Sequence, residues 1–368
     1  MIYLDNGATS FRKPETVELA MLRAMRCCAN PGRGAYPAAM AAADVLYRGR
    51  EVAAELFECK EEQVVFTHNC THGLNIAIHS LVKSGSRVVI SGFEHNAVTR
   101  PLHRIGAQVV VAGRRLYDWT DTLEAFEAAL KSGVDAAVFT HVSNAFGYIL
   151  PVEQMAALCR KYNVPFILDA AQSAGSIPVS LKQLRASFIA MPGHKGLLGP
   201  QGTGILLCAI PGEPLLTGGT GSQSRDQTMP EDLPDRLEPG TANVPGIAGL
   251  TAGMEFLQKS GINSIFMREH AALEQCVSDL RGMGLQVFSG PHQGATVSFV
   301  PPMDCETFGE KLAHRGIAVR SGLHCAPLAH ESVGTINTGT VRISFGHDAA
   351  PWQNRILKRN VLQILESI

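Results

Sequence analysis

Short apolar segments alternate with helical patterns between residues 63 and 208, and this alternation most strongly limits what the chain can fold into. Strands that alternate with helices form a largely parallel sheet, because each crossover between parallel strands needs a long connection. We therefore expect an α/β fold whose sheet is covered by helices on both faces. The expected strands are 63–67, 87–91, 108–111, 136–141, 165–169, 187–191 and 204–208. The expected helices include 14–28, 38–57, 71–82, 121–132 and 152–162.

The composition changes after the last of these strands. Residues 212–243 are rich in Gly, Pro and polar side chains, and we expect a long excursion there. Two helices then precede shorter strands at 296–300, 317–320 and 341–345 and a closing helix from residue 350. We expect a large α/β domain at 14–245 and a smaller α+β domain formed by 1–13 together with 246–368.

Charge and composition exclude several classes of function. The net charge is −1, so no overall field attracts nucleic acid or an anionic membrane. The opening Met1-Ile2-Tyr3-Leu4 lacks the basic flank of an export signal, and no apolar stretch reaches membrane-spanning length. The nine cysteines lack CxxC spacing, so we expect the reduced thiols of a cytoplasmic protein.

Two strand ends carry an acid and an amine that together suit one cofactor. Asp169 ends one expected strand, and Lys195 follows the next one. Ligands of open α/β sheets bind beyond the carboxyl ends of the strands, so both side chains are expected at one site. Pyridoxal phosphate needs a lysine for its Schiff base and an acid that keeps its ring nitrogen protonated. Taken singly, Asp169 could instead be a helix N-cap, and Lys195 could be a solvated loop lysine.

Polar residues at two other strand ends allow more than one interpretation. Thr71 opens an expected helix, where it either caps the helix or offers a hydroxyl and free N–H groups to a phosphate. His95 is either an ordinary loop histidine or a ring stacked on a cofactor that also moves protons. His68 and His72 lie four residues apart, but no acidic or thiolate ligand accompanies them in sequence, so we expect no metal site.

A loop cysteine and a strand arginine complete the candidates. Cys325 lies in a loop between Arg320 and Pro327, where cationic neighbours such as His324 favour a reactive thiolate if they turn towards it. Arg342 lies inside an otherwise apolar strand, and burying it is costly without a carboxylate partner. That carboxylate belongs either to a substrate or to an acidic residue of the chain.

These residues resemble the class V aminotransferase family, within fold type I of the pyridoxal phosphate enzymes. The cysteine desulfurases and selenocysteine lyases are the most similar branch. The resemblance extends from Tyr3-Leu4-Asp5-Asn6 to Val341-Arg342-Ile343-Ser344. The run Arg320-Ser321-Gly322-Leu323-His324-Cys325-Ala326 is typical of the group II desulfurases. The resemblance thus implies a fold type I enzyme that works as a homodimer.

The resemblance also implies a role for each candidate residue. For the cofactor, it assigns the Schiff base to Lys195, the ring nitrogen to Asp169, the phenolic oxygen to Gln172, the ring face to His95, and the phosphate to Thr71, the backbone at His72, and His194. Thr241 resembles the threonine that reaches the phosphate of the neighbouring subunit. Asn144 and Arg342 match the groups that hold the substrate carboxylate, and we add Arg320 as a substrate-binding candidate. Cys325 matches the sulfur-accepting cysteine.

Three positions depart from the family pattern. Pro192 replaces a serine that usually stands two residues before the active-site histidine, which removes one hydroxyl and one backbone donor. Gly7 replaces an alanine, and Gly32 stands where group II members often carry histidine. The first change bears on phosphate binding and the last on substrate choice.

The expected reaction converts L-cysteine to L-alanine and transfers the sulfur to Cys325 as a persulfide. Lys195 and His95 are the expected proton carriers. A selenocysteine lyase or an aminotransferase would use the same pocket, and a sulfur or selenium carrier or an inactive scaffold is the non-enzymatic alternative. The expected partners are a second copy of the chain, L-cysteine or L-selenocysteine, and a separate sulfur or selenium acceptor protein.

Overall fold

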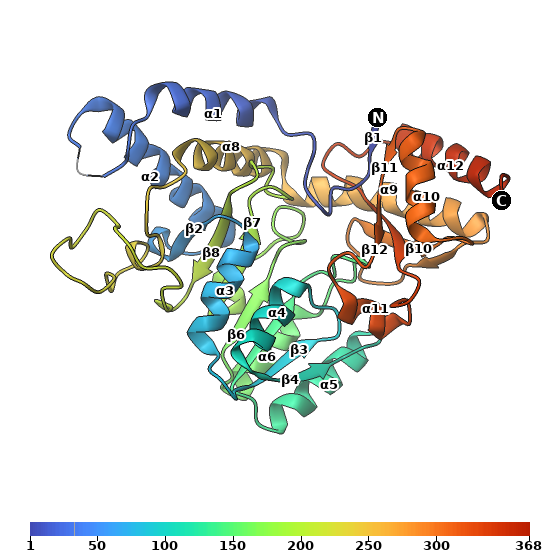
Figure 1. Cartoon of the computed structure of the whole chain (residues 1–368), viewed down its shortest axis with the longest axis horizontal. Coiled ribbons are helices and arrows are strands. Elements are labelled where there is room, and N and C mark those ends of the chain that lie inside the picture. The colour runs from blue at the N-terminus through green and yellow to red at the C-terminus, as the bar shows by residue number, and fades with distance from the viewer. Residues whose placement is uncertain (33) are drawn as a thin grey trace.

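The computed structural model describes residues 1–32 and 34–368, and a seven-stranded sheet lies at its centre (Figure 1). The strand order is β2-β8-β7-β6-β5-β3-β4. All neighbouring strands run parallel except β8, which is antiparallel to both β2 and β7. The largely parallel sheet is therefore confirmed. The bounds are β2 (Val64–Thr67), β3 (Arg87–Ser91), β4 (Gln108–Ala112), β5 (Ala136–Thr140), β6 (Phe166–Asp169), β7 (Phe188–Pro192) and β8 (Gly204–Cys208).

Both faces of this sheet are buried at its central strands. Val89 and Phe139 point into one hydrophobic cluster, whereas Val88 and Ile90 point into another on the opposite face. Strands with two buried faces read as continuous apolar runs, which is why the sequence located them well. The helices of this part are α1 (Glu15–Cys27), α2 (Pro37–Phe57), α3 (Cys70–Leu81), α4 (Asn96–Ile105), α5 (Trp119–Lys131), α6 (Val152–Lys161) and α7 (Leu181–Leu184).

Helix α4 was not among the expected helices. Pro101 lies inside it and normally argues against a helix interior, because proline lacks the N–H that closes a helical turn. Burial of Val98 and Leu102 nevertheless anchors the helix on the sheet, and Gly106 ends it in the left-handed conformation. Tertiary packing has overridden the local signal here.

A third hydrophobic cluster belongs to the elements at the right of Figure 1, the side on which both chain termini lie. It joins Ile2 and Leu4 to apolar residues between 272 and 364. The expected strand 317–320 is wrong as one element, because its two halves pair with different partners: β11 with β1, and β12 with β13. The elements are β1 (Ile2–Tyr3), β9 (Gln286–Phe288), β10 (Thr296–Val300), β11 (Ile317–Ala318), β12 (Arg320–Gly322), β13 (Thr340–Ser344), α9 (Ile262–Gly282), α10 (Cys305–His314), α11 (Pro327–Val333) and α12 (Pro351–Leu365).

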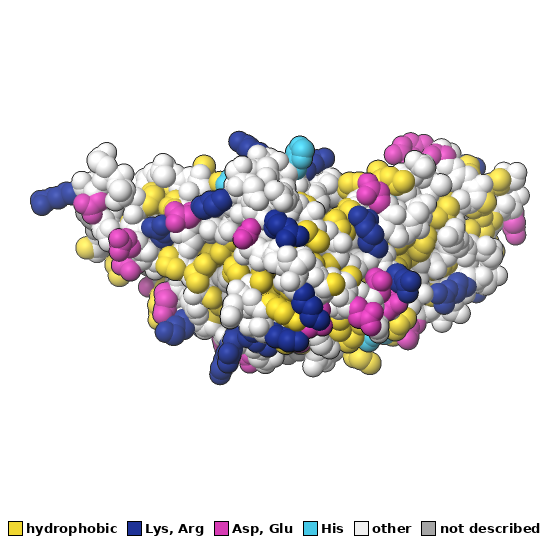
Figure 2. Space-filling view, turned by 90° about the horizontal axis from the view of Figure 1, so that it is seen from below, with side chains coloured by type: hydrophobic (Ala, Val, Ile, Leu, Met, Phe, Trp, Pro, Cys, Tyr) yellow, Lys and Arg dark blue, Asp and Glu magenta, His cyan; other side chains and the backbone are white. Residues whose placement is uncertain are grey.

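Residues 212–243 form the expected excursion, which extends from the left of the molecule in Figure 1. The 3₁₀ turn Asp235–Leu237 interrupts it before α8 (Val244–Ser260), which packs against α1 and α2. Figure 2 shows lysine, arginine and acidic side chains interspersed over the face seen there, as the near-zero net charge leads one to expect. Among the described helices, none is both long enough and apolar enough to span a bilayer.

Candidate active site

Most of the predicted site residues line one cavity at the carboxyl ends of the parallel strands, which we call the Lys195 cavity. The space between its walls, with open solvent included, is about 510 Å³. The predicted residues that line it are Thr71, His95, Asn144, Asp169, Gln172, His194 and Lys195.

Asp169 presents a buried carboxylate to this cavity from the end of β6. Its Oδ1 accepts hydrogen bonds from the Ala171 N–H at 2.9 Å and from the Cys70 thiol at 3.4 Å. Burial raises the pKa of Asp169, and the Ala171 hydrogen bond and the Lys195 charge oppose that shift. Oδ2 has no hydrogen-bond partner among the described residues, so it can accept one from a ligand.

Cys70 was missed by the sequence interpretation. Burial and the nearby Asp169 charge raise the pKa of the Cys70 thiol well above its ordinary value, so the thiol stays protonated and donates to Asp169. The two residues are 99 positions apart in sequence. The only local signal was the position of Cys70 beside Asn69, which caps α3 through its side chain.

Lys195 lies in the turn after β7, and its pKa is lowered by burial. The negative charge of Asp169 partly opposes this shift. A lowered pKa makes the free amine more available, which is the form that attacks an aldehyde or accepts a proton.

His95 is the N-cap of α4, and its Nδ1 accepts the Ala97 N–H at 3.0 Å. The proton of the neutral ring therefore lies on Nε2. Burial lowers the pKa of His95 to about 4, with smaller contributions from the charges of Lys195 and Arg342. At neutral pH His95 is thus an uncharged ring with one N–H donor.

The N-terminus of α3 borders the same cavity. Thr71 lies in its first turn, but the backbone N–H of His72 already donates to Asn69 Oδ1 at 2.9 Å. His194 is held by Thr9, whose Oγ1 lies 3.1 Å from the ring Nδ1. Pro192 also lines the cavity and offers no backbone N–H. Thr71 and His194 remain phosphate candidates, whereas the His72 amide would have to leave its cap.

Arg342 is almost fully buried, with 2% of its surface exposed. Its Nη2 lies 2.6 Å from Asp5 Oδ1, and its Nη1 donates to the Asn144 carbonyl at 2.9 Å. Its Nε has no partner among the described residues. The acidic residue that the sequence could not name is therefore Asp5. Asn144 reaches the Lys195 cavity itself, while its Nδ2 donates to the His324 carbonyl at 2.7 Å.

Cys325 is exposed, but it borders an adjoining hollow and not the Lys195 cavity. His324 does not turn towards it: the His324 ring is buried, with Nε2 3.0 Å from Thr340 Oγ1. Burial lowers the pKa of His324 well below its ordinary value, so the ring carries no charge that would favour a thiolate. Arg320 begins β12 as an exposed side chain outside the cavity lining.

Two further predicted residues make contacts that the sequence did not indicate. Gln172 lines the Lys195 cavity, and its Nε2 donates to the Gly7 carbonyl at 2.9 Å. Thr241 is exposed and lines a separate hollow together with His68 and His72. Its contribution to a neighbouring subunit stays a prediction.

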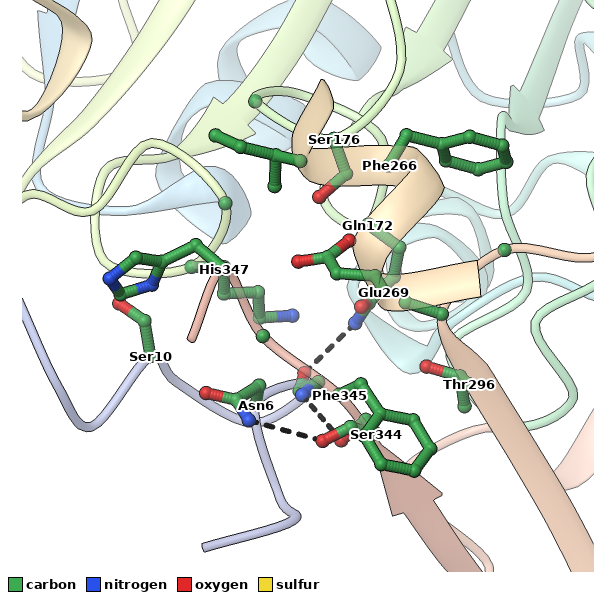
Figure 3. A pocket seen from close by; sticks show the side chains of 18 of the residues that line it. Asn6, Ser10, Gln172, Ser176, Phe266, Glu269, Thr296, Ser344, Phe345 and His347 are labelled. Atoms are coloured by element: carbon green, nitrogen blue, oxygen red, sulfur yellow. Dashed lines mark hydrogen bonds between the residues drawn. The ribbon is translucent and has the colours of Figure 1, made fainter. Parts of the chain in front are cut away.

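A second cavity shares Lys195 and Gln172 with the first in its wall, and Figure 3 shows it from close by. Glu269, from α9, is 4% exposed there, and its Oε2 has no partner among the described residues. Burial raises the pKa of Glu269 to about 8, which keeps much of this carboxyl protonated at neutral pH. Figure 3 shows it between the side chains of Ser176 and Gln172. Nothing in the local sequence marked Glu269 as buried.

The residues of the Lys195 cavity fit pyridoxal phosphate. The free Oδ2 of buried Asp169 would be satisfied by a protonated ring nitrogen, which is both a donor and a cation. The amine of Lys195 lines the same cavity, and the first turn of α3 lies at its wall for an anion. An acid, an amine and a helix N-terminus around one volume are the groups that this cofactor requires.

Comparisons with known proteins agree with this geometry. The family model described as aminotransferase class-V matches residues 2–351. A probable cysteine desulfurase of Pyrococcus abyssi is 32% identical, over 94% of this chain and 89% of that protein. A second, from Methanothermobacter thermautotrophicus, is 31% identical over 93% and 89%. The solved apo structure of a cysteine desulfurase from Thermococcus onnurineus NA1 superposes with a TM-score of 0.91 at 28% identity, covering 100% of this chain and 95% of that one. The chain belongs to the class V aminotransferase family.

Proposed function

We propose that this protein is a pyridoxal phosphate-dependent cysteine desulfurase. It converts L-cysteine to L-alanine, and Cys325 receives the sulfur as a persulfide. The observation that carries the proposal is that Lys195 and Asp169 line one cavity at the strand ends, with Cys325 on the adjoining hollow. Membership of the class V family and relatives named cysteine desulfurase support the choice of substrate.

We infer these roles from the side chains. The cofactor, when bound at Lys195, supplies an electron sink that makes the substrate Cα–H acidic and its C–S bond labile. Asp169 Oδ2 would hold the proton on the ring nitrogen. The Lys195 amine, whose pKa burial lowers, is suited to take the Cα proton. His95 offers its Nε2–H as a proton donor near the same wall.

Cys325 takes the sulfur in a step that needs no outside oxidant. Its thiolate attacks the substrate sulfur, the C–S bond breaks, and the Cβ carbon gains a proton. One cysteine and one enzyme thiol thus become one alanine and one enzyme persulfide. Asn144 would orient the substrate carboxylate from the cavity wall, and Arg342 would support it through the Asn144 carbonyl. Arg320, which is exposed outside the cavity, would act on substrate only as it enters.

The experiment compares the purified holoprotein with Lys195→Ala and Cys325→Ala, with the exposed Lys182→Ala as control. The parent and the control are expected to absorb as a lysine-bound cofactor and to form alanine from L-cysteine. Lys195→Ala should lose both, whereas Cys325→Ala should keep the cofactor and lose the persulfide. A parent that binds no cofactor refutes the proposal. If Cys325→Ala still cleaves selenocysteine but not cysteine, then the covalent sulfur step is specific to cysteine.

We also propose that the protein is a cytoplasmic homodimer. Helix α1 exposes Leu19, Leu22 and Met25, whose exposed fractions are 56%, 47% and 67%. Apolar side chains clustered on one helix mark protein–protein surfaces. Leu22→Glu/Met25→Glu should give a monomer by light scattering, whereas Met267→Glu, at an equally exposed site on α9, should not. A dimer in both would refute this surface. All nine cysteines are free thiols, which suits a reducing compartment.

A further inference from the structure

The hollow beside Cys325 is a continuation of the Lys195 cavity towards solvent. The two share Thr71, His95 and Ala97 in their walls. The outer part, which we call the Cys325 hollow, has an empty volume of about 670 Å³. Its other lining residues are Asn75, Asn96, Arg100, Pro101, Arg104 and Cys325. A molecule that approaches the exposed Cys325 thiol through this hollow therefore meets these side chains.

The Cys325 hollow is basic. Arg100 and Arg104 lie one turn apart on α4, so they share a face of that helix. Both are exposed, and neither makes an ion pair or side-chain hydrogen bond within residues 1–32 and 34–368. No acidic residue of the described chain lines the hollow. In a chain with 32 basic and 33 acidic residues, this is a local excess of positive charge.

The thiol and the two arginines are held in a fixed relation. The Cys325 carbonyl accepts the N–H of Asn96 at 2.8 Å, and Asn96 is the first residue of the helix that carries both arginines. His324 and Cys325 have φ values of 53° and 56°. This left-handed backbone costs roughly 1–2 kcal/mol per non-glycine residue, so it persists only where the surroundings impose it. The Asn144–His324 hydrogen bond supplies the second restraint.

We propose that the Cys325 hollow is the docking site of the sulfur acceptor, and that the acceptor is a protein segment whose cysteine is flanked by acidic residues. This inference rests on the proposed function. The acceptor thiolate attacks the outer sulfur of the Cys325 persulfide, the S–S bond within that persulfide breaks, and its electron pair returns to Cys325 as a thiolate. One acceptor thiol and one enzyme persulfide thus become one acceptor persulfide and one enzyme thiol. Arg100 and Arg104 bind the acidic flanks and raise the local acceptor concentration.

The first test uses two synthetic peptides of equal length, each with one cysteine, flanked by Asp and Glu in one and by Ser and Gln in the other. Sulfur transfer from the holoprotein supplied with L-cysteine is followed by mass spectrometry of the peptide. At low ionic strength the acidic peptide should accept sulfur about tenfold faster, because steering by charge typically changes association at least tenfold. The preference should vanish in Arg100→Gln/Arg104→Gln and in high salt.

The matched control is Arg355→Gln/Arg359→Gln, which removes two exposed arginines at the same spacing on α12. It should keep the full preference for the acidic peptide. Alanine formation with a neutral small-thiol reductant should be equal in the parent and both double variants. Equal transfer to the two peptides by the parent, or an equal loss in the control, overturns the proposal.

A second test separates this inference from the proposed function, because it needs no turnover. Iodoacetate is anionic and iodoacetamide is neutral, and peptide mapping gives the alkylation rate of Cys325 with each. The ratio of the two rates should fall several-fold in Arg100→Gln/Arg104→Gln and stay unchanged in the α12 control. An unchanged ratio in the first variant sinks the basic docking site even if alanine is produced. Absence of alanine from the parent sinks the proposed function instead.

Discussion

The buried pair of Arg342 and Asp5 offers a quantitative test of how the site is held together. Asp5→Ala would leave a guanidinium that is 2% exposed with one carbonyl acceptor, since its Nε already lacks a partner. Breaking a buried ion pair by removing one partner costs about 3–5 kcal/mol. The Asp5 side chain is 17% exposed, so water replaces part of its role and the lower end, about 3 kcal/mol, applies.

This free energy converts to a melting temperature. The entropy of unfolding is about 2.1 cal/mol/K per residue, or about 0.8 kcal/mol/K for 368 residues. A loss of about 3 kcal/mol then lowers Tm by about 4 °C, measurable by calorimetry. The control is Asp348→Ala, which breaks the exposed Arg12–Asp348 pair at 3.5 Å and should lower Tm by about 1 °C or less.

A double variant tests whether the unpaired buried charge of Arg342 causes the loss of stability in Asp5→Ala. In Asp5→Ala/Arg342→Leu no charge is left buried, so the double variant should be more stable than Asp5→Ala alone. If Asp5→Ala shifts Tm no more than the control does, then the pair does not hold β13 to the N-terminal segment and the reasoning is wrong. The reasoning would be refuted equally if the effects of Asp5→Ala and Arg342→Leu on the free energy of unfolding were additive.

Three further outcomes follow from the contacts described. Gly175→Ala should lower Tm by several degrees, because its φ is +91° and a Cβ would lie 2.2 Å from the carbonyl oxygen of Gly196, the residue after Lys195. The control is Gly202→Ala, where φ is +78° but the space is open, and it should cost about 1 kcal/mol. Burial lowers the pKa of His141 to about 4, below its unfolded value of about 6.5, so the unfolded chain binds the extra proton in that window. The contribution of neutral His141 to the free energy of unfolding is complete above pH 6.5 and is lost as the pH falls to about 4, a change of about 3 kcal/mol. Urea titrations at several pH values should therefore find a smaller loss of stability towards acid in His141→Gln than in the parent. Gly7→Ala would place a Cβ 3.3 Å from the Arg342 Cζ and so disturb the guanidinium that supports the substrate carboxylate. We therefore expect KM for L-cysteine to change several-fold with kcat nearly constant. A change in kcat alone would contradict a role in substrate binding.

The sequence predicted the sheet and the strand ends because these depend on local signals. Runs such as Val88 to Ile90 are apolar throughout, since both faces of the sheet are covered there, and the strand boundaries are correct to within a residue or two. Asp169 and Lys195 were placed together by the rule that parallel strands end at one edge.

The rest depends on contacts between distant residues. The partner of Arg342 is 337 positions away, and no periodicity could have selected Asp5 among 33 acidic residues. Cys70 stands just before the expected helix 71–82, and no local pattern could show that Asp169 of β6 would lie beside it. The domain boundary near residue 245 remains a prediction. Helix α8 begins there and would belong to the smaller domain by its position in the chain, yet it packs on α1 and α2 of the expected large domain.

Strand β1 pairs in parallel with β11, and Ile2 and Leu4 are buried in the cluster that spans 272–364. On a ribosome, residues 2–4 are synthesised long before Ile317 exists to receive them. The opening strand must therefore wait, unpaired and apolar, while the central sheet assembles, and its docking becomes a late event of high contact order. Until that event Asp5 cannot reach Arg342, so catalytic competence would appear only after the two distant ends of this region have met.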